Sequence, residues 1–192
     1  MSAPEINSPG DVVEYLKAQH ETIRELFNEV LDAAGAETRD QAFTRLRTML
    51  AVHETAEEMV VHPRVRRKVD GGAQIVDERL AEEHDAKVLL RDIEDLPRDS
   101  AEFGKGVIHL QAAVLKHAEA EEKLEFTALE AELDDTELRK LAEAVAVAEQ
   151  IAPTRPHPGI ESAAANFAAG PFASVLDRAR DALGGAFTSK SS

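Results

Sequence analysis

Residues 43–60 read FTRLRTMLAVHETAEEMV, a run in which apolar residues and potential metal ligands share one spacing. They follow one another in alternating three- and four-residue steps, at Phe43, Leu46, Leu50, His53, Glu57 and Val60. Because an α-helix turns about every 3.6 residues, these positions lie along one face. His53 and Glu57 therefore occupy a stripe that is otherwise apolar, and we expect them to point into the core of a helical bundle.

The same pattern returns in residues 107–124, which read VIHLQAAVLKHAEAEEKL. This second stripe consists of Val107, Leu110, Val114, His117, Glu121 and Leu124. One histidine precedes each pattern. These histidines belong to the stripe Val13, Leu16, His20, Ile23, Phe27 and Val30 and to the less regular stripe Leu80, His84 and Val88. Each ligand-type residue of the second half lies 64 positions after its counterpart in the first (84−20, 117−53, 121−57).

Burial of four imidazoles and two carboxylates in one bundle is unfavourable unless they have a binding partner. An unpaired buried charge costs several kcal/mol or shifts its pKa until it is neutral. An ordinary hydrogen-bond partner explains any one of these residues alone, but not six residues matched in type, face and offset. We therefore predict that one metal site uses His20, His53, Glu57, His84, His117 and Glu121 as ligands.

Caps and helix breakers predict an all-α, up-down-up-down four-helix bundle. The expected helices run from about residue 11 (or 8) to 35, from 38 or 40 to 62, from 74 to 96 and from 100 to 132. Pro63 and Pro97 are expected to stop the second and third helices, since proline lacks the backbone N–H group. The short connections, including the basic and Gly-rich residues 64–73, favour antiparallel neighbours.

The chain is expected to have three parts. Residues 1–134 form the bundle, and residues 135–152 add a fifth helix, over about 136–152, that Pro153 ends. Residues 153–192 combine a Pro/Gly-rich linker with a short amphipathic helix around residues 172–183. This last part is expected to dock on the bundle as a strap, with a dimer contact or a lid over the metal pocket as alternatives.

Composition narrows the classes of partner and metal. The 192 residues include no cysteine, which excludes disulfides, iron-sulfur clusters and thiolate zinc sites. The net charge of −15 disfavours nucleic acid and anionic membrane surfaces as partners. No apolar run approaches the roughly 20 residues that span a bilayer, and the first ten residues do not resemble a secretory signal. We expect a cytoplasmic monomer or weak dimer whose partners are small molecules.

The types of ligand atom, imidazole nitrogen and carboxylate oxygen, indicate which metal binds. Nitrogen and carboxylate ligands spread over four helices differ from a structural zinc site, which is closed, four-coordinate and often thiolate-containing. Two carboxylates able to bridge two ions predict two non-haem iron ions, with manganese as the alternative. Ferritin-like bundles use Glu-x-x-His, and no histidine in this chain has a glutamate three positions before it.

The order and spacing instead resemble the hemerythrin-like (HHE cation-binding) family. Its pattern H…HxxxE…H…HxxxE is matched by His20, H53-E-T-A-E57, His84 and H117-A-E-A-E121. The resemblance covers roughly residues 11 to 130, and the later segments look like the longer actinobacterial members, including mycobacterial ones. It implies four imidazole ligands, with Glu57 and Glu121 as bridges. Glu54 is expected to support a ligand, and direct metal binding is its alternative role.

Four other residues are placed outside the ligand set. His62 and His109 fall off the apolar stripes, which indicates surface positions. His157 has Glu161 four residues later, but the intervening Pro158 denies that pair a helix. Tyr15 lies about 140° around the helix from His20, which places it beside the site.

The resemblance also suggests a reaction. Oxygen-carrying hemerythrins resemble this chain but use a fifth histidine in a His-x-x-x-His turn, where this sequence has Leu80 and Val88. If each iron is six-coordinate, two histidines, two bridging carboxylate oxygens and an oxo or hydroxo bridge fill about five places. Both irons then keep an open position, which favours reaction over reversible oxygen carriage. The expected function is reaction with small oxidants in oxidative stress, first hydrogen peroxide in a catalase- or peroxidase-like manner. Binding or sensing of oxygen, nitric oxide or iron without turnover is the alternative.

Overall fold

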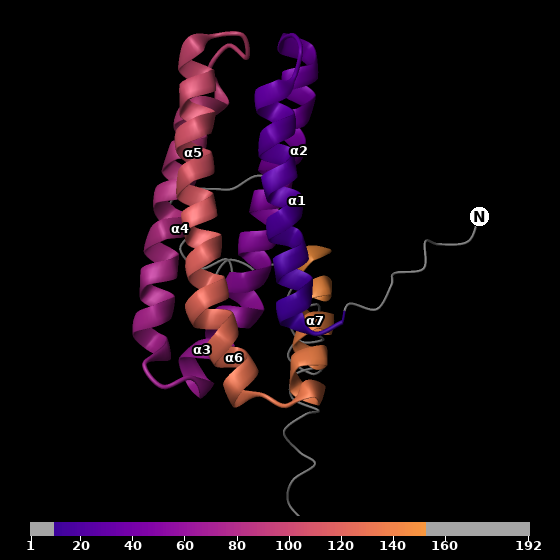
Figure 1. Cartoon of the computed structure of the whole chain (residues 1–192), viewed down its shortest axis with the longest axis vertical. Helices are drawn as coiled ribbons and strands as arrows, with labels where there is room; N and C mark the ends of the chain where they lie inside the picture. The colour runs from indigo at the N-terminus through magenta and orange to yellow at the C-terminus, as the bar shows by residue number, and fades with distance from the viewer. Residues whose placement is uncertain (1–9, 153–192) are drawn as a thin grey trace, which may run out of the picture.

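Two helical hairpins lie side by side and form the bundle, in a computed structural model that describes residues 10–152 (Figure 1). The hairpins are α1 (Val12–Asp32) with α2 (Ala36–Ala56), and α4 (Gly72–Glu94) with α5 (Ala101–Ala120). Helix α1 also packs against α5. The described residues contain no β-strand, so the prediction of an all-α, up-down-up-down bundle is confirmed.

Local signals explain where the long helices begin. The Asp11 carboxylate accepts a hydrogen bond from the backbone N–H of Glu14 at 2.9 Å, which caps α1. The Ser100 hydroxyl accepts one from the N–H of Phe103 at 3.1 Å, which caps α5. Gly35 has a φ of 90°, a conformation that other residues rarely adopt, and it separates α1 from α2.

Two short π-helical segments extend α2 and α5. They are η1 (Glu57–Val61), followed by α3 (His62–Lys68), and η2 (Glu121–Phe126), followed by α6 (Thr127–Glu132). Each begins at the glutamate of a His-x-x-x-Glu motif. In a π turn the hydrogen bond closes over five residues instead of four, so the turn holds one extra residue. The backbone N–H of His62 accordingly donates to the carbonyl of Glu57.

Pro63 does not end the second helical segment, so that prediction was wrong. Helix α3 continues to Lys68, with Pro63 at its second position. The regular α-helical hydrogen-bond ladder is already interrupted by η1, directly before the proline. The missing N–H of Pro63 therefore falls where the chain tolerates it.

The extra residue also changes which side chains face inward after each π turn. Leu124 was predicted in the apolar stripe of the fourth helical segment, but its exposed fraction is 49%. Glu125 and Phe126 are fully buried in its place. The straight α-helical periodicity holds up to Glu121 and fails after it, because η2 rotates the following residues relative to the stripe.

The buried stripe of α4 also differs from the predicted one. Leu80, His84 and Val88 are only partly buried. The buried positions follow alternating three- and four-residue steps, at Val76, Arg79, Glu83, Ala86, Leu90 and Ile93. Helix α4 therefore buries Glu83 more completely than His84.

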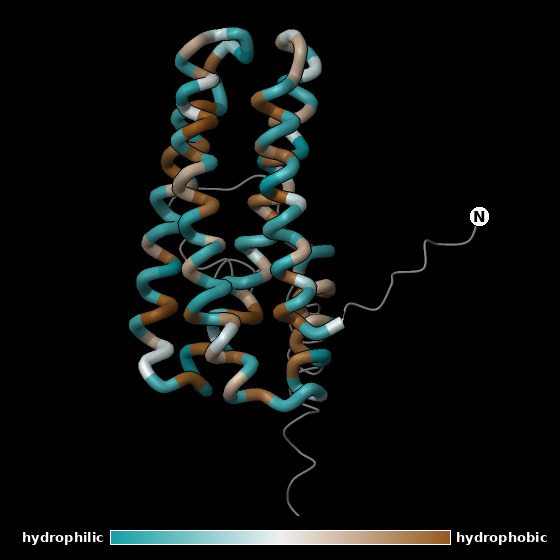
Figure 2. The backbone as a smooth tube through the Cα atoms, viewed as in Figure 1, coloured by the Kyte–Doolittle hydropathy of each residue, from teal (hydrophilic) through white to brown (hydrophobic). Residues whose placement is uncertain are grey.

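The apolar core consists of two clusters, and hydrophilic positions interrupt the hydrophobic ones along every long helix (Figure 2). The upper cluster, toward the α1–α2 turn, includes Ile23, Phe27, Phe43, Leu46, Leu90, Phe103 and Leu110. The lower cluster, toward α7, includes Leu16, Val60, Val65, Phe126, Leu129 and Leu141. Along α1, His20 lies between Leu16 of the lower cluster and Ile23 of the upper one. The predicted ligands thus lie in a polar layer between two hydrophobic clusters.

A fifth helix, α7 (Asp135–Glu149), closes the lower cluster beside α1, α2 and η1. Asp134 and Glu137 form a reciprocal capping box at its start. Its first turn is fixed by an ion pair between Glu137 and the buried Arg64 of α3. None of the helices in residues 10–152 is long and apolar enough to cross a membrane. The predicted linker, the final amphipathic helix and His157 lie outside the described residues.

Gly106 lets α4 and α5 approach closely, and we expect Gly106→Ala to destabilise the bundle. A Cβ atom at this position would overlap the Cγ2 of Ile93, a branched side chain with little freedom in a helix. The free energy of unfolding should fall by about 1–3 kcal/mol, as in other overpacked cores. Urea unfolding measures this value. Gly104→Ala is the matched control, because a Cβ there meets no atom within 4 Å.

The control should raise the free energy of unfolding by up to about 1 kcal/mol, since alanine favours the helix more than glycine does. Equal effects of the two substitutions would show that the approach of α4 to α5 is not limited by Gly106.

Candidate metal centre

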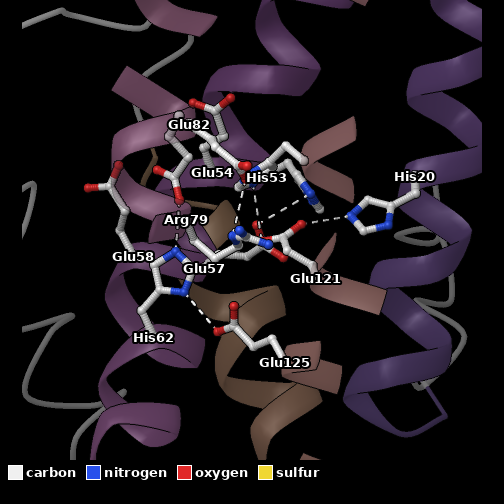
Figure 3. A network of polar contacts seen from close by, with 12 residues as sticks. His20, His53, Glu54, Glu57, Glu58, His62, Arg79, Glu82, Glu121 and Glu125 are labelled. Atoms are coloured by element: carbon white, nitrogen blue, oxygen red, sulfur yellow. Dashed lines mark hydrogen bonds and ion pairs between the residues drawn. The ribbon is translucent and has the colours of Figure 1, made fainter. Parts of the chain in front are cut away.

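Four predicted ligands meet in the polar layer. They are His20 of α1, His53 of α2, Glu57 at the start of η1 and Glu121 at the start of η2, and one ligand atom of each lies within 4.8 Å of those of the others. All four side chains are buried. Figure 3 shows the imidazole of His20 directed at the Glu121 carboxylate. The two His-x-x-x-Glu motifs thus bring their glutamates to the same point from opposite hairpins.

The histidines approach the carboxylates through their Nε2 atoms. Glu121 lies between two imidazoles, with His20 Nε2 at 3.3 Å and His117 Nε2 at 3.2 Å from its oxygens. His53 Nε2 lies 3.4 Å from an oxygen of Glu57. His117, on α5, therefore adjoins the four-residue group through Glu121.

Most of these inward-facing atoms have no hydrogen-bond partner among residues 10–152. They are Nε2 of His20, Nε2 of His117 and both carboxylate oxygens of Glu57 and of Glu121. The approaches of 3.2 and 3.3 Å to Glu121 lack the geometry of hydrogen bonds. A buried polar atom without a partner costs about 1–3 kcal/mol, and more when it is charged. A cation would satisfy all of them at once, so this nitrogen and oxygen set fits the non-haem metal that the sequence predicts.

The outward-facing nitrogen of each histidine is held by an acceptor. The Nδ1 atoms of His53 and His20 lie 2.7 Å from Gln19 Oε1 and 2.8 Å from Glu122 Oε1. The Nδ1 of His117 lies 3.3 Å from Glu82 Oε2. Carbonyl and carboxylate oxygens only accept, so each Nδ1 carries a hydrogen, and in a neutral ring the Nε2 lone pair then faces the centre. This tautomer is the one that binds metal through Nε2.

Without a metal, the net charge of the centre depends on which of its carboxyl groups and imidazoles are protonated. Burial and the neighbouring Glu121 raise the pKa of Glu57 well above its usual value. Burial acts to raise the pKa of Glu121, but the neighbouring His117 and His20 together outweigh it and lower the pKa well below its usual value. Burial and the neighbouring His20 lower the pKa of His53 to about 3, which keeps this ring neutral. A bound metal would displace the proton of Glu57, so metal binding and proton release are coupled.

His84 differs from the other predicted ligands. It lies on α4, is partly buried and does not belong to the four-residue group. The adjacent Glu83 is 1% exposed. The metal-binding role of His84 therefore stays a prediction.

His62 is buried at 2% exposure, so the prediction of a surface position was wrong. The imidazole bridges two buried carboxylates, with Nδ1 2.9 Å from Glu125 and Nε2 2.8 Å from Glu83 (Figure 3). In a straight α-helix His62 would point away from the stripe. The π turn brings the residue five positions after Glu57 back beneath it. The one available signal in the sequence was Pro63, a helix breaker inside a helical pattern.

This histidine carries a positive charge. Burial acts to lower the pKa of His62, but the hydrogen bonds to Glu125 and Glu83 outweigh it and raise the pKa to about 10. The same contact lowers the pKa of Glu83 to about 2, although burial opposes that shift. A buried carboxylate–imidazolium–carboxylate group thus lies next to the candidate metal ligands. We call Glu83, His62 and Glu125 the lower triad.

A second cation faces the layer from α4. The Nζ atom of Lys87 lies 2.6 Å from Glu58, 3.3 Å from Glu83 and 3.5 Å from Glu54. Burial raises the pKa of Glu54 to about 8, with Lys87 opposing the shift. Glu54 thus follows His53 directly in the chain and forms an ion pair with Lys87, and its role at the centre stays a prediction.

A small cavity borders the imidazoles. Its wall combines His20, His53, His117 and Glu54 with apolar residues of the upper cluster, including Ile23, Leu50 and Val114. A small molecule at this position would contact the ligand rings and one carboxyl group. The surrounding hydrocarbon limits the access of water.

Comparisons with known proteins agree with this fold and with binding of a cation. A family model described as the hemerythrin HHE cation binding domain matches residues 11–129. A hemerythrin-like protein of Schizosaccharomyces pombe is 26% identical over 136 residues, which cover 70% of this chain and 67% of that protein. A crystal structure of a hemerythrin HHE cation-binding domain-containing protein from Mycobacterium kansasii has a TM-score of 0.65 at 20% identity, covering 88% of this chain and 98% of that one. At this identity the last likeness concerns the fold.

The charge of the lower triad predicts a pH dependence of stability. The folded-state pKa of His62, about 10, lies above the ordinary histidine value of 6.5. The contribution of protonated His62 to the free energy of unfolding is thus fully present below about pH 6.5 and is lost as the pH rises through 10. In metal-free protein, urea unfolding should give a free energy of unfolding that falls over this window.

In His62→Gln the decrease should be shallower by up to about 1.4 kcal/mol per pH unit, the contribution of one proton. The exposed His109 supplies the control, since His109→Gln should keep the slope of the unmodified protein. An unchanged slope in His62→Gln would show that this imidazole is not protonated in the folded state.

Proposed function

The chain belongs to the hemerythrin HHE cation-binding domain family, and on that basis we propose that it is a di-iron protein that reacts with small oxidants, first of all hydrogen peroxide. The proposed ligands are His20, His53, Glu57, His84, His117 and Glu121, with the two glutamates as bridges. The observation that carries the proposal is the convergence of buried, unpartnered ligand atoms of Glu57, Glu121, His20 and His117.

When bound, two iron ions supply redox equivalents and Lewis acidity at this layer. Disproportionation of hydrogen peroxide balances without an external donor. Oxidation of one molecule to oxygen releases two protons and two electrons, and reduction of a second molecule to two waters takes them up. The chemistry requires a site that admits a small molecule, moves protons and excludes larger reductants.

The residues around the centre support each of these three requirements: access for a small molecule, proton transfer and exclusion of larger reductants. The cavity beside His20, His53 and His117 has room only for a small molecule. Glu54 borders that cavity and can hold or give up a proton at its carboxyl oxygens. The upper and lower clusters close both ends of the layer, which protects the centre from bulk water.

Binding or sensing without turnover is the second candidate function. It is favoured by a hydrogen-bond path that links His53 through Gln19 to Glu149 at the end of α7. A sensor needs such a link between the metal ligands and a separate structural element. The two candidates differ in whether added peroxide is consumed repeatedly or changes the protein once.

The test combines metal analysis with an oxygen electrode. We expect about two irons per chain after anaerobic loading with ferrous iron, and repeated release of oxygen when peroxide is added. His53→Ala and Glu57→Gln should each lower iron affinity by more than about tenfold and abolish oxygen release, because each removes a proposed ligand. His109→Ala, at an exposed position of α5, should retain both properties.

One zinc ion per chain and no iron would contradict the binuclear proposal. Two irons per chain with one spectral change and no oxygen release would favour binding or sensing over turnover. Loss of iron in His109→Ala, with retention in His53→Ala, would contradict the ligand assignment itself.

A further inference from the structure

Gln19 connects a proposed metal ligand to the fifth helix. Its side chain is largely buried on α1. The Oε1 atom of Gln19 accepts a hydrogen bond from His53 Nδ1 at 2.7 Å, and its Nε2 atom donates to Glu149 Oε1. The other oxygen of Glu149 accepts from the Tyr15 hydroxyl at 2.6 Å. Residues of α1, α2 and the last position of α7 thus form one hydrogen-bonded path.

The chemistry of the groups gives this path a direction. An ionised carboxylate only accepts hydrogen bonds, so Gln19 must turn its NH₂ group toward Glu149. The amide carbonyl then necessarily faces His53. Because a carbonyl only accepts, His53 Nδ1 must carry the ring hydrogen, and the Nε2 lone pair is left for the centre. The negative charge of Glu149 therefore selects the amide orientation, and the amide orientation selects the tautomer.

Tyr15 completes the arrangement. Burial, followed by the hydrogen bond to Glu149, raises the pKa of Tyr15 to about 12, so the phenol stays a neutral donor near neutral pH. It donates a hydrogen bond to the second oxygen of Glu149. Helical spacing predicted Tyr15 beside the metal site. In the structure the Tyr15 hydroxyl donates to Glu149 and not to a predicted metal ligand.

We propose that Glu149 is a positioning residue of the metal centre, which acts through Gln19 to hold the His53 imidazole in the tautomer that binds metal. Helix α7 then supports the site as well as covering the lower cluster. The inference rests on the metal-binding part of the proposed function and is independent of any reaction with peroxide. By reciprocity, metal bound to His53 stabilises the last turn of α7.

Glu149→Gln tests the proposal with nearly unchanged shape. An amide at position 149 can accept or donate, so it no longer fixes which end of Gln19 faces His53. Iron affinity, measured by competition with a chelator, should fall about tenfold, in the range found for groups that orient metal ligands. The ¹⁵N spectrum of the His53 ring in metal-free protein should change from one tautomer to a mixture of two.

Glu137→Gln is the matched control. It removes a carboxylate of the first turn of the same helix, and its ion pair with the buried Arg64, whereas Glu149 is the last residue of that helix. This variant should lower the melting temperature but leave iron affinity and the His53 spectrum unchanged. The contrast separates positioning of a ligand from general attachment of α7.

Gln19→Met provides a second route if Glu149→Gln folds poorly, because it removes the amide while keeping side-chain length. The double variant should bind iron no more weakly than Gln19→Met alone, since Glu149 acts through Gln19. Additive losses, or unchanged iron affinity and a single His53 tautomer in Glu149→Gln, would overturn the inference. Failure of the unmodified protein to bind iron would instead overturn the proposed function.

Discussion

The rest of the structure depends on the burial of acids and imidazoles between two hydrophobic clusters. Glu57 and Glu121 are fully buried, and their oxygens have no hydrogen-bond partner in the described part of the chain. Hydrophobic burial on both sides holds these groups away from water. Hydrogen bonds from the outer nitrogens of His20, His53 and His117 then aim the inner nitrogens at the carboxylates. The arrangement favours a bound cation because a cation is the partner that all of these atoms lack.

The two π turns place the acids of this layer. Each begins at a candidate bridging glutamate and inserts one residue into an otherwise regular helix. The insertion brings His62 and Glu125 beneath the centre, where they form the lower triad with Glu83. An α-helix would have turned Leu124 inward instead. A π turn therefore begins at the glutamate of each His-x-x-x-Glu motif, and both turns place acids in the polar layer.

The sequence predicted the features that depend on helical periodicity within one segment. It placed His20, His53, Glu57, His117 and Glu121 on inward faces, and the structure buries all five. It missed His62 and the buried face of α4, for two physical reasons. A π turn has no signature in a hydrophobic pattern, and charged residues such as Arg79 and Glu83 conceal a stripe that contains them. The contact of Gln19 with His53 depends on how α1 and α2 are rotated against each other, which the spacing along one helix does not specify.

Anomalous X-ray diffraction at the iron edge, on crystals of iron-loaded protein, tests the central claim most directly. The account predicts anomalous peaks in the polar layer, within coordination distance of Nε2 of His20, His53 and His117 and of the carboxylates of Glu57 and Glu121. Iron located instead at the lower triad would contradict it. So would an iron-free layer in which ordered water bridges the same atoms, because water would then satisfy the groups that we assign to a metal.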